Sequence, residues 1–579
     1  MERVISPYPL GANFSSLVVL MILLGFVNFS ASTAIATGVS EKVDASESLS
    51  PLHIAIVSIP LHGHFKPLQI IGEEFTRRRH RVTYFIENPK WCKTLHHTQD
   101  MVDCVVLPSY DVFSENFFRN LSQLKSNLAS FTEIFVEIYR HHELHLGDYL
   151  SAVKKVHATH PLSMILSDLS TLVGGSVATA LNIPSVNLLP LTTLIPLGVS
   201  SQIPLMGTGW PARMNKWQRM DNFGLKVLLT ILPDKIDRVN TFRSFYGIKP
   251  VKEGFELGGF REIIIAPTLW GFDIPHEVCP NFHPLGLLSF RDTHTPPVEK
   301  ELAAFLNNCQ VGSIYINFGT LAELSPFQHE KIAKALRQLP YCIVWKLKDS
   351  KNQNVLKYLG EIKERTFFSR FFLSPLNIMR HKYMVVFLSH CGDASIHEAI
   401  GAKLPIVGIP FFADQVDVCQ RVEESNIGKC VGDKNSFTSE SLAKTIDYVV
   451  KNSRQMRRNI EKLLQISKFL GGAERAVDIL ESRQRNHLLG RNETLERCVV
   501  FNEELETEIL PLRIRIGQFD VFMVWFIAFL SLWLSIFMCL EKVFLRIKTT
   551  FFGRLTHPKI RRRRFKTKSR SLQREVALN

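Results

Sequence analysis

The chain has 579 residues, of which 46% are hydrophobic and 21% charged, a composition that excludes a disordered protein and indicates an ordered globular one. At this length we expect more than one domain. The net charge of +15 is unevenly placed, because residues 541–579 contain 13 Lys or Arg and two Glu and so hold +11 of it. The high charge therefore belongs mostly to this tail and not to the folded part.

Residues 1–36 have the layout of a secretory signal peptide. Arg3 precedes an apolar stretch around Leu17–Val27, and small residues end at Ala36, where cleavage is predicted. An uncleaved membrane anchor is the alternative. Asn120 and Asn492 head N-glycosylation sequons that suit a lumenal body.

The ten cysteines contain no CxxC pair. We therefore predict no zinc or other metal site from them, and their disulfide pairing is left open.

Residues 50–287 are predicted to form a first α/β domain. The apolar run "LHIAIVSIP" indicates a strand, and an amphipathic helix and a second strand, "RVTYFI", follow it. The stretch "PLSMILSDLSTLVGGSVATALNIPSVNLL" repeats the order of strand, turn, helix and strand. This order predicts a parallel sheet with helical crossovers.

A polar segment with a Pro pair, residues 288–300, is the predicted linker. Strand, glycine turn and helix begin again with "GSIYINFGTLAEL", and residues 301–510 are predicted to form a second α/β domain with closing helices. Two α/β domains that face each other across a cleft are the simplest architecture for this pattern.

One stretch of the second domain, Phe387–Gln415, reads "FLSHCGDASIHEAIGAKLPIVGIPFFADQ". It predicts a strand, a tight glycine-containing turn, a helix that stops before Pro405, and a further strand. Ligands of such units bind outside the carboxyl ends of the strands. A helix that begins directly after the turn favours an anion such as a phosphate. The stretch therefore suggests a nucleotide-diphosphate site.

Residues 521–540 contain no charged residue, and their length matches the roughly 20 residues that a membrane-spanning helix needs. The basic tail, 541–579, follows at once and includes "RRRR". Such a run alone suggests nucleic acid, but after a membrane span it is typical of the cytosolic flank and of lipid headgroup contact. We predict a lumenal body, one span, a cytosolic tail, and no nucleic-acid partner.

The stretch Phe387–Gln415 resembles the donor-binding signature of the UDP-glycosyltransferases, the family of animal UDP-glucuronosyltransferases and plant glycosyltransferases. "HGHFKPLQIIGEEFTRRRHRVTYF", "ILSDLSTLVGGSVATALNIPSV" and "INFGT" resemble other motifs of this family. The resemblance covers most of residues 50–545. It implies an α/β GT-B fold, in which two Rossmann-like domains enclose the active site, with a C-terminal transmembrane helix.

The resemblance also implies the catalytic residues. His64 matches the family's base, which takes a proton from the acceptor hydroxyl, because an alcohol is a poor nucleophile at neutral pH. His62 is the competing histidine, and the Gly-His-x-x-Pro pattern favours His64. Asp168 matches the acid that holds the base and stabilises the imidazolium. A helix N-cap is the alternative role of Asp168.

The donor-binding residues that the resemblance implies lie in the second domain. His390, Gly392, Ser395 and Thr320 are expected to bind the diphosphate, and Glu398 the ribose hydroxyls. Asp414 and Gln415 are expected to bind the sugar, and the ring of Phe372 could stack on uracil. No metal or other cofactor is expected beside the UDP-sugar co-substrate, because the helix dipole and His390 neutralise the diphosphate.

Three positions depart from the family pattern and leave donor affinity and sugar identity open. Cys391 replaces a glycine, Ala394 replaces an asparagine, and "FFLSP" stands where the family has W-x-P-Q. A catalytically impaired membrane protein that binds or scaffolds a partner is therefore one alternative. Another GT-B enzyme, such as a sugar-nucleotide epimerase, is less favoured because it needs neither signal peptide nor span.

The acceptor is predicted to be a small lipophilic molecule delivered from the membrane, because stretches such as "PLTTLIPLGVSSQIPLMGTGW" in the first domain are apolar. Glucosyl or glucuronosyl transfer is expected, and the endoplasmic reticulum is the expected compartment, from the layout of the family. A homo-oligomer is left open.

Overall fold

The computed structural model describes residues 50–95, 101–190, 202–231, 236–251, 263–275, 281–288, 296–347, 353–372, 374–485, 526–536 and 540. The predicted signal peptide (1–36), the basic tail (541–579) and the Asn492 sequon lie outside these residues, as does most of the predicted linker. Asn120 is described and is exposed on a helix, whereas Leu121 and Ser122 of its sequon are buried.

The first sheet has seven described strands that pair in parallel, in the order β3-β2-β1-β4-β5-β6-β7. Their bounds are β1 His53–Val57, β2 Arg81–Ile86, β3 Val102–Val106, β4 Met164–Asp168, β5 Ser185–Leu188, β6 Ile263–Ala266 and β7 Phe282–Pro284. All five residues of β1 are buried. A strand covered on both faces needs a continuous apolar run and not an alternating one, which explains the sequence of β1.

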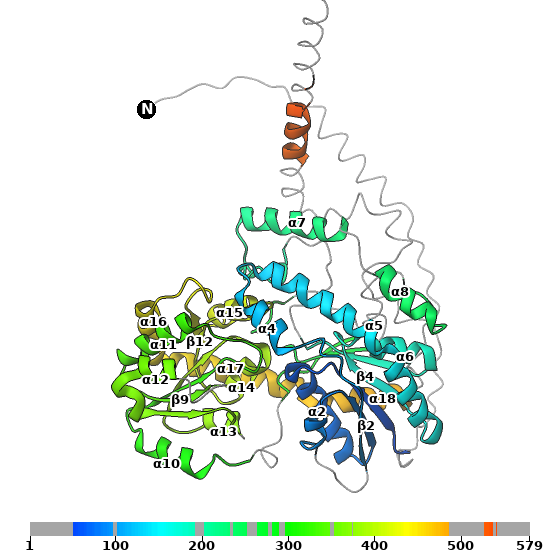
Figure 1. Cartoon of the computed structure of the whole chain (residues 1–579), viewed down its shortest axis with the longest axis horizontal. Coiled ribbons are helices and arrows are strands. Elements are labelled where there is room, and N and C mark those ends of the chain that lie inside the picture. The colour runs from blue at the N-terminus through cyan, green and yellow to red at the C-terminus, as the bar shows by residue number, and fades with distance from the viewer. Residues whose placement is uncertain are drawn as a thin grey trace, which may run out of the picture. The chain divides into compact units, whose positions relative to one another are not determined.

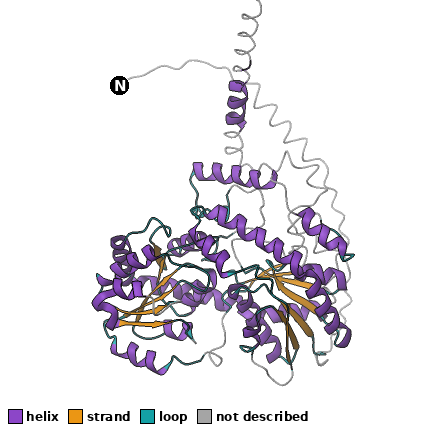
Figure 2. Ribbon diagram, in the orientation of Figure 1, coloured by secondary structure: helices purple, strands orange, loops and turns teal. Residues whose placement is uncertain are grey.

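Helices connect and cover these strands (Figures 1 and 2). They are α2 His62–Arg77, α3 Pro89–Cys92, α4 Glu115–Gln123, α5 Asn127–Thr159, α6 Leu172–Leu181, α7 Lys216–Ile231 and α8 Ile236–Phe245. The long helix α5 begins at Ser126, whose side chain accepts a hydrogen bond from Ala129 N and so caps the helix.

The second sheet has six described strands, also parallel, in the order β10-β9-β8-β11-β12-β13. Its strands are β8 Ser313–Asn317, β9 Cys342–Lys346, β10 Thr366–Ser369, β11 Met384–Ser389, β12 Ile406–Gly408 and β13 Gly428–Cys430. The accompanying helices are α10 Lys300–Asn308, α11 Pro326–Arg337, α12 Gln353–Leu359, the 3-10 helix η2 Gly360–Arg365, α13 Pro375–Met379, α14 Asp393–Gly401, α15 Gln415–Glu424, α16 Ser439–Lys451, α17 Ser453–Leu470 and α18 Gly472–Arg485.

Each sheet reverses its strand order at its first strand. β1 lies between β2 and β4, and β8 lies between β9 and β11. The crevice outside the carboxyl ends at such a reversal is where α/β sheets bind ligands. Asp168 ends β4, His390 follows β11, and His64 lies at the start of the helix after β1, so the topology brings the predicted site to these edges.

The last described helix of the body, α18, returns to the first half of the chain. Ala476, Val477 and Leu480 share a core with Phe75 of α2. Arg78 pairs with Asp478 at 2.7 Å, which adds a polar contact at the edge of this packing. The first half therefore keeps a C-terminal helix as part of its own core.

The described residues form three disulfides: Cys92–Cys104, Cys309–Cys342 and Cys419–Cys430. Near the C-terminus, residues 526–536 are helical and exposed. No helix among the described residues has the length and apolarity required to cross a membrane, and residues 521–525 and 537–539 of the predicted span lie outside them.

Candidate active site

His64 and Asp168 form a hydrogen-bonded pair between two elements of the first half. His64 is the third residue of α2, and Asp168 is the last residue of β4. His64 Nδ1 lies 2.8 Å from Asp168 Oδ1. The Asp168 side chain is 0% exposed, whereas that of His64 is 17% exposed and so can meet a ligand.

The carboxylate of Asp168 is held at both oxygens. Ser170 N donates to Oδ1 at 2.9 Å, and the Thr171 hydroxyl donates to Oδ2. Thr171, and not Asp168, is the N-cap residue of α6, so the carboxylate stabilises the turn before the helix. A carboxylate fixed in this way keeps the proton of His64 on Nδ1 and leaves Nε2 with its lone pair, as a base requires.

His390, directly after β11, lies against two glycines. A Cβ at Gly319 would lie 2.7 Å from His390 Nε2, and one at Gly392 would lie 2.5 Å from it. Only glycine leaves room for the imidazole at both positions. Burial and, to a smaller extent, the charge of Lys346 lower the pKa of His390 to about 4. The ring is therefore neutral at pH 7 and would contact a diphosphate by hydrogen bonding.

The turn before α14 presents backbone N–H groups beside His390. Gly392 is the N-cap of α14, and no described side chain caps this end. Ser395 is half-buried in the first turn, and Thr320 is exposed after the turn of Gly319. Burial raises the pKa of Asp393, the first residue of the helix, to about 7, so its carboxyl group opposes a bound phosphate less than an ordinary aspartate would.

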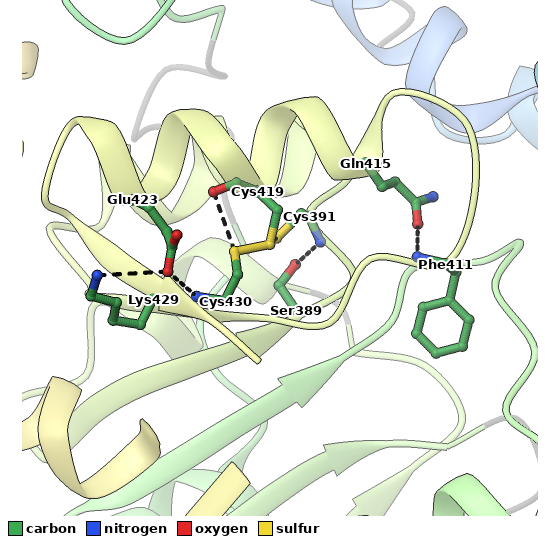
Figure 3. Close-up of a disulfide and its surroundings, with 8 residues drawn as sticks. All are labelled: Ser389, Cys391, Phe411, Gln415, Cys419, Glu423, Lys429 and Cys430. Carbon is green, nitrogen blue, oxygen red and sulfur yellow. Dashed lines mark hydrogen bonds and ion pairs between the residues drawn. A yellow bond between two sulfur atoms is a disulfide. The ribbon is translucent and has the colours of Figure 1, made fainter. Parts of the chain in front are cut away.

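The cysteine that departs from the family pattern is accommodated in the interior. Cys391 has a φ of 62°, which is the left-handed region that glycine adopts without strain. Its sulfur lies 3.1 Å from the Cys419 sulfur, beside the Cys419–Cys430 disulfide (Figure 3). Gly408 leaves the space that these three sulfurs fill. Cys391 therefore packs into the core beneath α15.

Glu398 of α14, the predicted ribose carboxylate, is half-buried and forms an ion pair with Lys66 of α2. Sequence reasoning missed Lys66. Its place two residues after His64, on the same helix, brings the predicted catalytic segment and the predicted ribose-binding residue into one site.

The predicted sugar-binding pair lies where α15 begins. Gln415 Oε1 accepts hydrogen bonds from Phe411 N at 2.9 Å (Figure 3) and from Phe412 N at 3.3 Å, so its amide nitrogen is the group left for a sugar. Burial, together with the neighbouring carboxylates of Asp393 and Asp417, raises the pKa of Asp414 to about 7. A positive charge on His64 acts on this pKa in the opposite direction, so these two residues are close enough to interact electrostatically.

Phe372 is not placed to stack on a uracil ring. It is 3% exposed and packs in the core, 6.0 Å between ring centroids from Tyr315. The neighbouring Phe371 is 66% exposed. Because the two rings point to opposite sides of the segment after β10, Phe371 is the aromatic side chain that a base could reach, and the sequence pattern did not distinguish them.

A loop of the first half holds α15 in place. Asp417 accepts hydrogen bonds from Gly207 N at 2.6 Å and Gly209 N at 2.8 Å. Arg421 Nη2 donates to Trp210 O at 2.8 Å. These contacts fix the helix that carries Asp414 and Gln415, and their partners are too far apart in the sequence for any motif to show them.

Comparison with known proteins places this site in a family. The profile of the family described as "UDP-glucoronosyl and UDP-glucosyl transferase" matches residues 90–470. The chain therefore belongs to the UDP-glycosyltransferases. It is 24% identical over 430 residues to UDP-glucuronosyltransferase 2A3 of Cavia porcellus, covering 70% of this chain and 78% of that protein.

A second relative, human 2-hydroxyacylsphingosine 1-beta-galactosyltransferase, is 28% identical over 269 residues, which are 44% of this chain and 46% of that protein. Among solved structures, the kitacinnamycin glycotransferase matches with a TM-score of 0.56 at 18% identity. A UDP-glucosyltransferase of Polygonum tinctorium matches with a TM-score of 0.55 at 16% identity. The alignments cover 75% and 76% of this chain and all of the other chains, and they confirm the predicted GT-B-like α/β fold.

Proposed function

We propose that this enzyme transfers a sugar from a UDP-sugar to a hydroxyl group of a small lipophilic acceptor, with inversion at the anomeric carbon. One observation carries the proposal: the His64–Asp168 pair lies in the first half of the chain, and Lys66 on the same helix as His64 reaches Glu398 in the second. A base and a predicted nucleotide-binding residue therefore border the same site.

In the proposed reaction, His64 Nε2 takes the proton of the acceptor hydroxyl while the oxygen attacks the anomeric carbon. The bond from that carbon to the UDP oxygen breaks as the new bond forms, and UDP leaves with the electron pair. A single displacement of this kind inverts the configuration. Asp168 stabilises the imidazolium through the 2.8 Å hydrogen bond at Nδ1.

The second half supplies the contacts for the donor. His390, Ser395 and the N–H groups at the start of α14 would bind the diphosphate, and Thr320 would add a hydroxyl. Glu398 would bind the ribose hydroxyls in place of Lys66. Asp414 and the Gln415 amide nitrogen would bind the sugar. This arrangement needs no metal ion for the transfer step.

Lys346 adds a cation that sequence reasoning did not place. Its Nζ donates to Gly319 O at 3.4 Å, and its charge acts on His390. A cation at the phosphate turn favours an anionic donor and offsets the neutral state of His390.

A lumenal position and a lipophilic acceptor are part of the same proposal. Three disulfides suit an oxidising compartment, as the predicted signal peptide requires. The exposed helix 526–536 includes Phe529, Leu532 and Trp533, and such a surface suits a membrane. The chain is also similar to an ecdysteroid UDP-glucosyltransferase of Mamestra brassicae nuclear polyhedrosis virus, at 28% identity over 206 residues. The name of this protein and that of the human 2-hydroxyacylsphingosine galactosyltransferase state a steroid and a sphingosine compound as their acceptors.

The alternative of a catalytically impaired binding protein depends on Cys391, on Ala394 and on the missing Gln of the W-x-P-Q stretch. The Cys391 thiol is buried beside the disulfide, so the substitution does not fill the phosphate turn. This burial weakens the argument for a binding protein.

The experiment that tests the proposed function is a mass-spectrometric screen of UDP-glucose, UDP-glucuronate and UDP-galactose against lipophilic alcohols. We expect a glycoside and UDP in equal amounts from at least one pair, and none with His64→Ala. Absence of a product with the wild-type enzyme across the panel would favour the binding protein.

A further inference from the structure

A buried cluster of two histidines and a glutamate lies near the pair of His64 and Asp168. Glu87 follows β2, and His141 and His145 are one turn apart on α5. His141 Nε2 lies 2.6 Å from Glu87 Oε1, and His145 Nε2 lies 3.1 Å from Glu87 Oε2. All three side chains are buried, and the two imidazoles stack with centroids 4.1 Å apart.

The hydrogen bond at Nδ1 of His145 determines whether Nε2 of the same ring carries a proton or a lone pair. His145 Nδ1 lies 2.9 Å from His141 O, and because a carbonyl oxygen can only accept, Nδ1 carries the proton. In the neutral ring, Nε2 then presents a lone pair to the Glu87 carboxylate, and two acceptors face each other in a buried site. A positive charge must lie between them, either a proton on Nε2 or a metal cation.

We propose that Glu87, His141 and His145 bind one divalent transition metal ion, with Zn²⁺ as the expected occupant. Each residue offers one ligand atom, and these three atoms lie within 4.8 Å of one another. Two imidazole nitrogens and one carboxylate oxygen form a common zinc ligand set, which leaves a fourth position for water or another group. A backbone carbonyl that accepts from the second ring nitrogen, as His141 O does, is the usual support of a histidine ligand.

The residues around the cluster indicate a structural role for this ion, near the active site. Tyr149 OH donates to Glu87 Oε1 at 3.1 Å and lies 3.4 Å from Ser58 O, directly after β1. The charge of Asp168 acts on His141. A bound ion would therefore join the carboxyl end of β2 to α5, while Tyr149 links the same helix to the end of β1. The ion would lie near the pair of His64 and Asp168, and it takes no part in the transfer.

The spacing of the ligands explains why the sequence did not reveal this site. His141 and His145 have the i,i+4 spacing of two ligands on one helix face, but Glu87 lies 54 residues before His141. Only the packing of α5 on the end of β2 joins them. The prediction of no metal site considered the cysteines and did not consider these histidines.

The test measures metal content in the full-length chain, purified from cells supplied with zinc and dialysed against EDTA to remove loosely bound ions. Inductively coupled plasma mass spectrometry is expected to find one zinc per chain. The His141→Ala/His145→Ala variant is expected to lose it, and Glu87→Gln to lose most of it. His142→Ala is the matched control, because His142 is buried on the same helix but bonds to Ser176 Oγ.

Exchange of zinc for Co²⁺ gives a readout that is independent of activity. We expect visible absorption bands of a four-coordinate Co²⁺ site in the wild type and in His142→Ala, and none in the double variant. A wild-type chain that is free of metal after folding with zinc would overturn the proposal and leave a protonated His145. Full metal content in the double variant would overturn the assignment of the ligands. Glu87→Gln keeps the shape of the side chain, so it provides the test if the double variant fails to fold.

Discussion

Lys66 of α2 and Glu398 of α14 form an ion pair that joins the first half of the chain to the second. Glu398 is the carboxylate proposed for the ribose hydroxyls, and Lys66 lies two residues after the proposed base. Both side chains are about one-fifth exposed, so the pair is open to a ligand. The arrangement implies that a nucleotide and Lys66 compete for the same carboxylate.

Glu398→Gln is expected to weaken UDP binding roughly 10- to 100-fold, because the ribose loses charge-assisted hydrogen bonds worth about 1.5–3 kcal/mol. Lys66→Met is expected to retain the affinity for UDP or to increase it, since the competing cation is removed. Isothermal titration with UDP measures both variants. Wild-type affinity in Glu398→Gln would show that the carboxylate does not contact the ribose.

Gly319→Ala and Gly392→Ala are each expected to weaken UDP binding at least about tenfold, because the new methyl group would displace the His390 ring from a hydrogen bond of the stronger kind. Gly360→Ala is the matched control. Like Gly319 it has a positive φ, of 55°, but a Cβ there meets nothing within 4 Å. Gly360→Ala therefore has the backbone strain of a positive φ but no steric clash with a neighbouring side chain. Equal losses of UDP affinity in Gly319→Ala and Gly360→Ala would contradict the account.

The buried carboxyl group of Asp393 predicts a pH dependence of stability. Its pKa is about 7 in the folded protein and 3.8 in its ordinary state, so the folded chain keeps a proton that the unfolded chain releases. The contribution of Asp393 to stability is therefore full below about pH 4 and is lost as the pH rises through 7, by at most about 4 kcal/mol. Nearby, His397 Nε2 lies 3.7 Å from Asp393 Oδ1.

Urea unfolding at about pH 5 and about pH 8 measures this effect. Asp393→Asn, which mimics the protonated side chain, is expected to lose less stability than the wild type between the two values. An identical loss in both proteins would show that Asp393 is not the group responsible.

Much of the fold could be predicted from the sequence, because strands buried on both faces require unbroken apolar runs. β1, β4, β8 and β11 follow from such runs, and the turns after them carry the predicted site residues. β13, with the sequence Gly-Lys-Cys, has no such pattern and forms because β12 offers an edge to pair with. β7 is likewise three residues long and depends on β6.

The predicted site was incomplete where contacts join distant segments. Lys66, Lys346 and the Gly207–Asp417 contact have no local signature, since each acts through a partner that only folding brings near. The choice between Phe371 and Phe372 depended on which ring faces the core. The disulfides could not be predicted for the same reason, because pairing follows from the distances between strands and helices.

The contact between α15 and the loop of the first half predicts that Asp417→Ala destabilises the protein by about 1–3 kcal/mol, because two backbone N–H groups lose their buried partner. We also expect a higher KM for the donor, since α15 carries Asp414 and Gln415. Chemical unfolding and donor kinetics measure the two effects.

Glu461→Ala is the control for this prediction. Glu461 forms an exposed ion pair with Lys403 at 3.1 Å, and such pairs contribute about 1 kcal/mol or less. A loss of stability in Asp417→Ala no larger than that in Glu461→Ala would refute the role given to this contact.

Comparison of UDP binding with turnover in His64→Ala tests the central proposal most directly, once the screen has given a donor and an acceptor. If His64 is the base, kcat falls by about 100- to 10,000-fold while the Kd for UDP stays within about twofold of the wild type. Asp168→Asn is also expected to lower kcat while leaving the Kd for UDP nearly unchanged, because it disturbs the orientation of His64 and not the donor contacts. A His64→Ala enzyme that keeps its kcat, or that loses UDP binding in proportion to its turnover, would contradict the account.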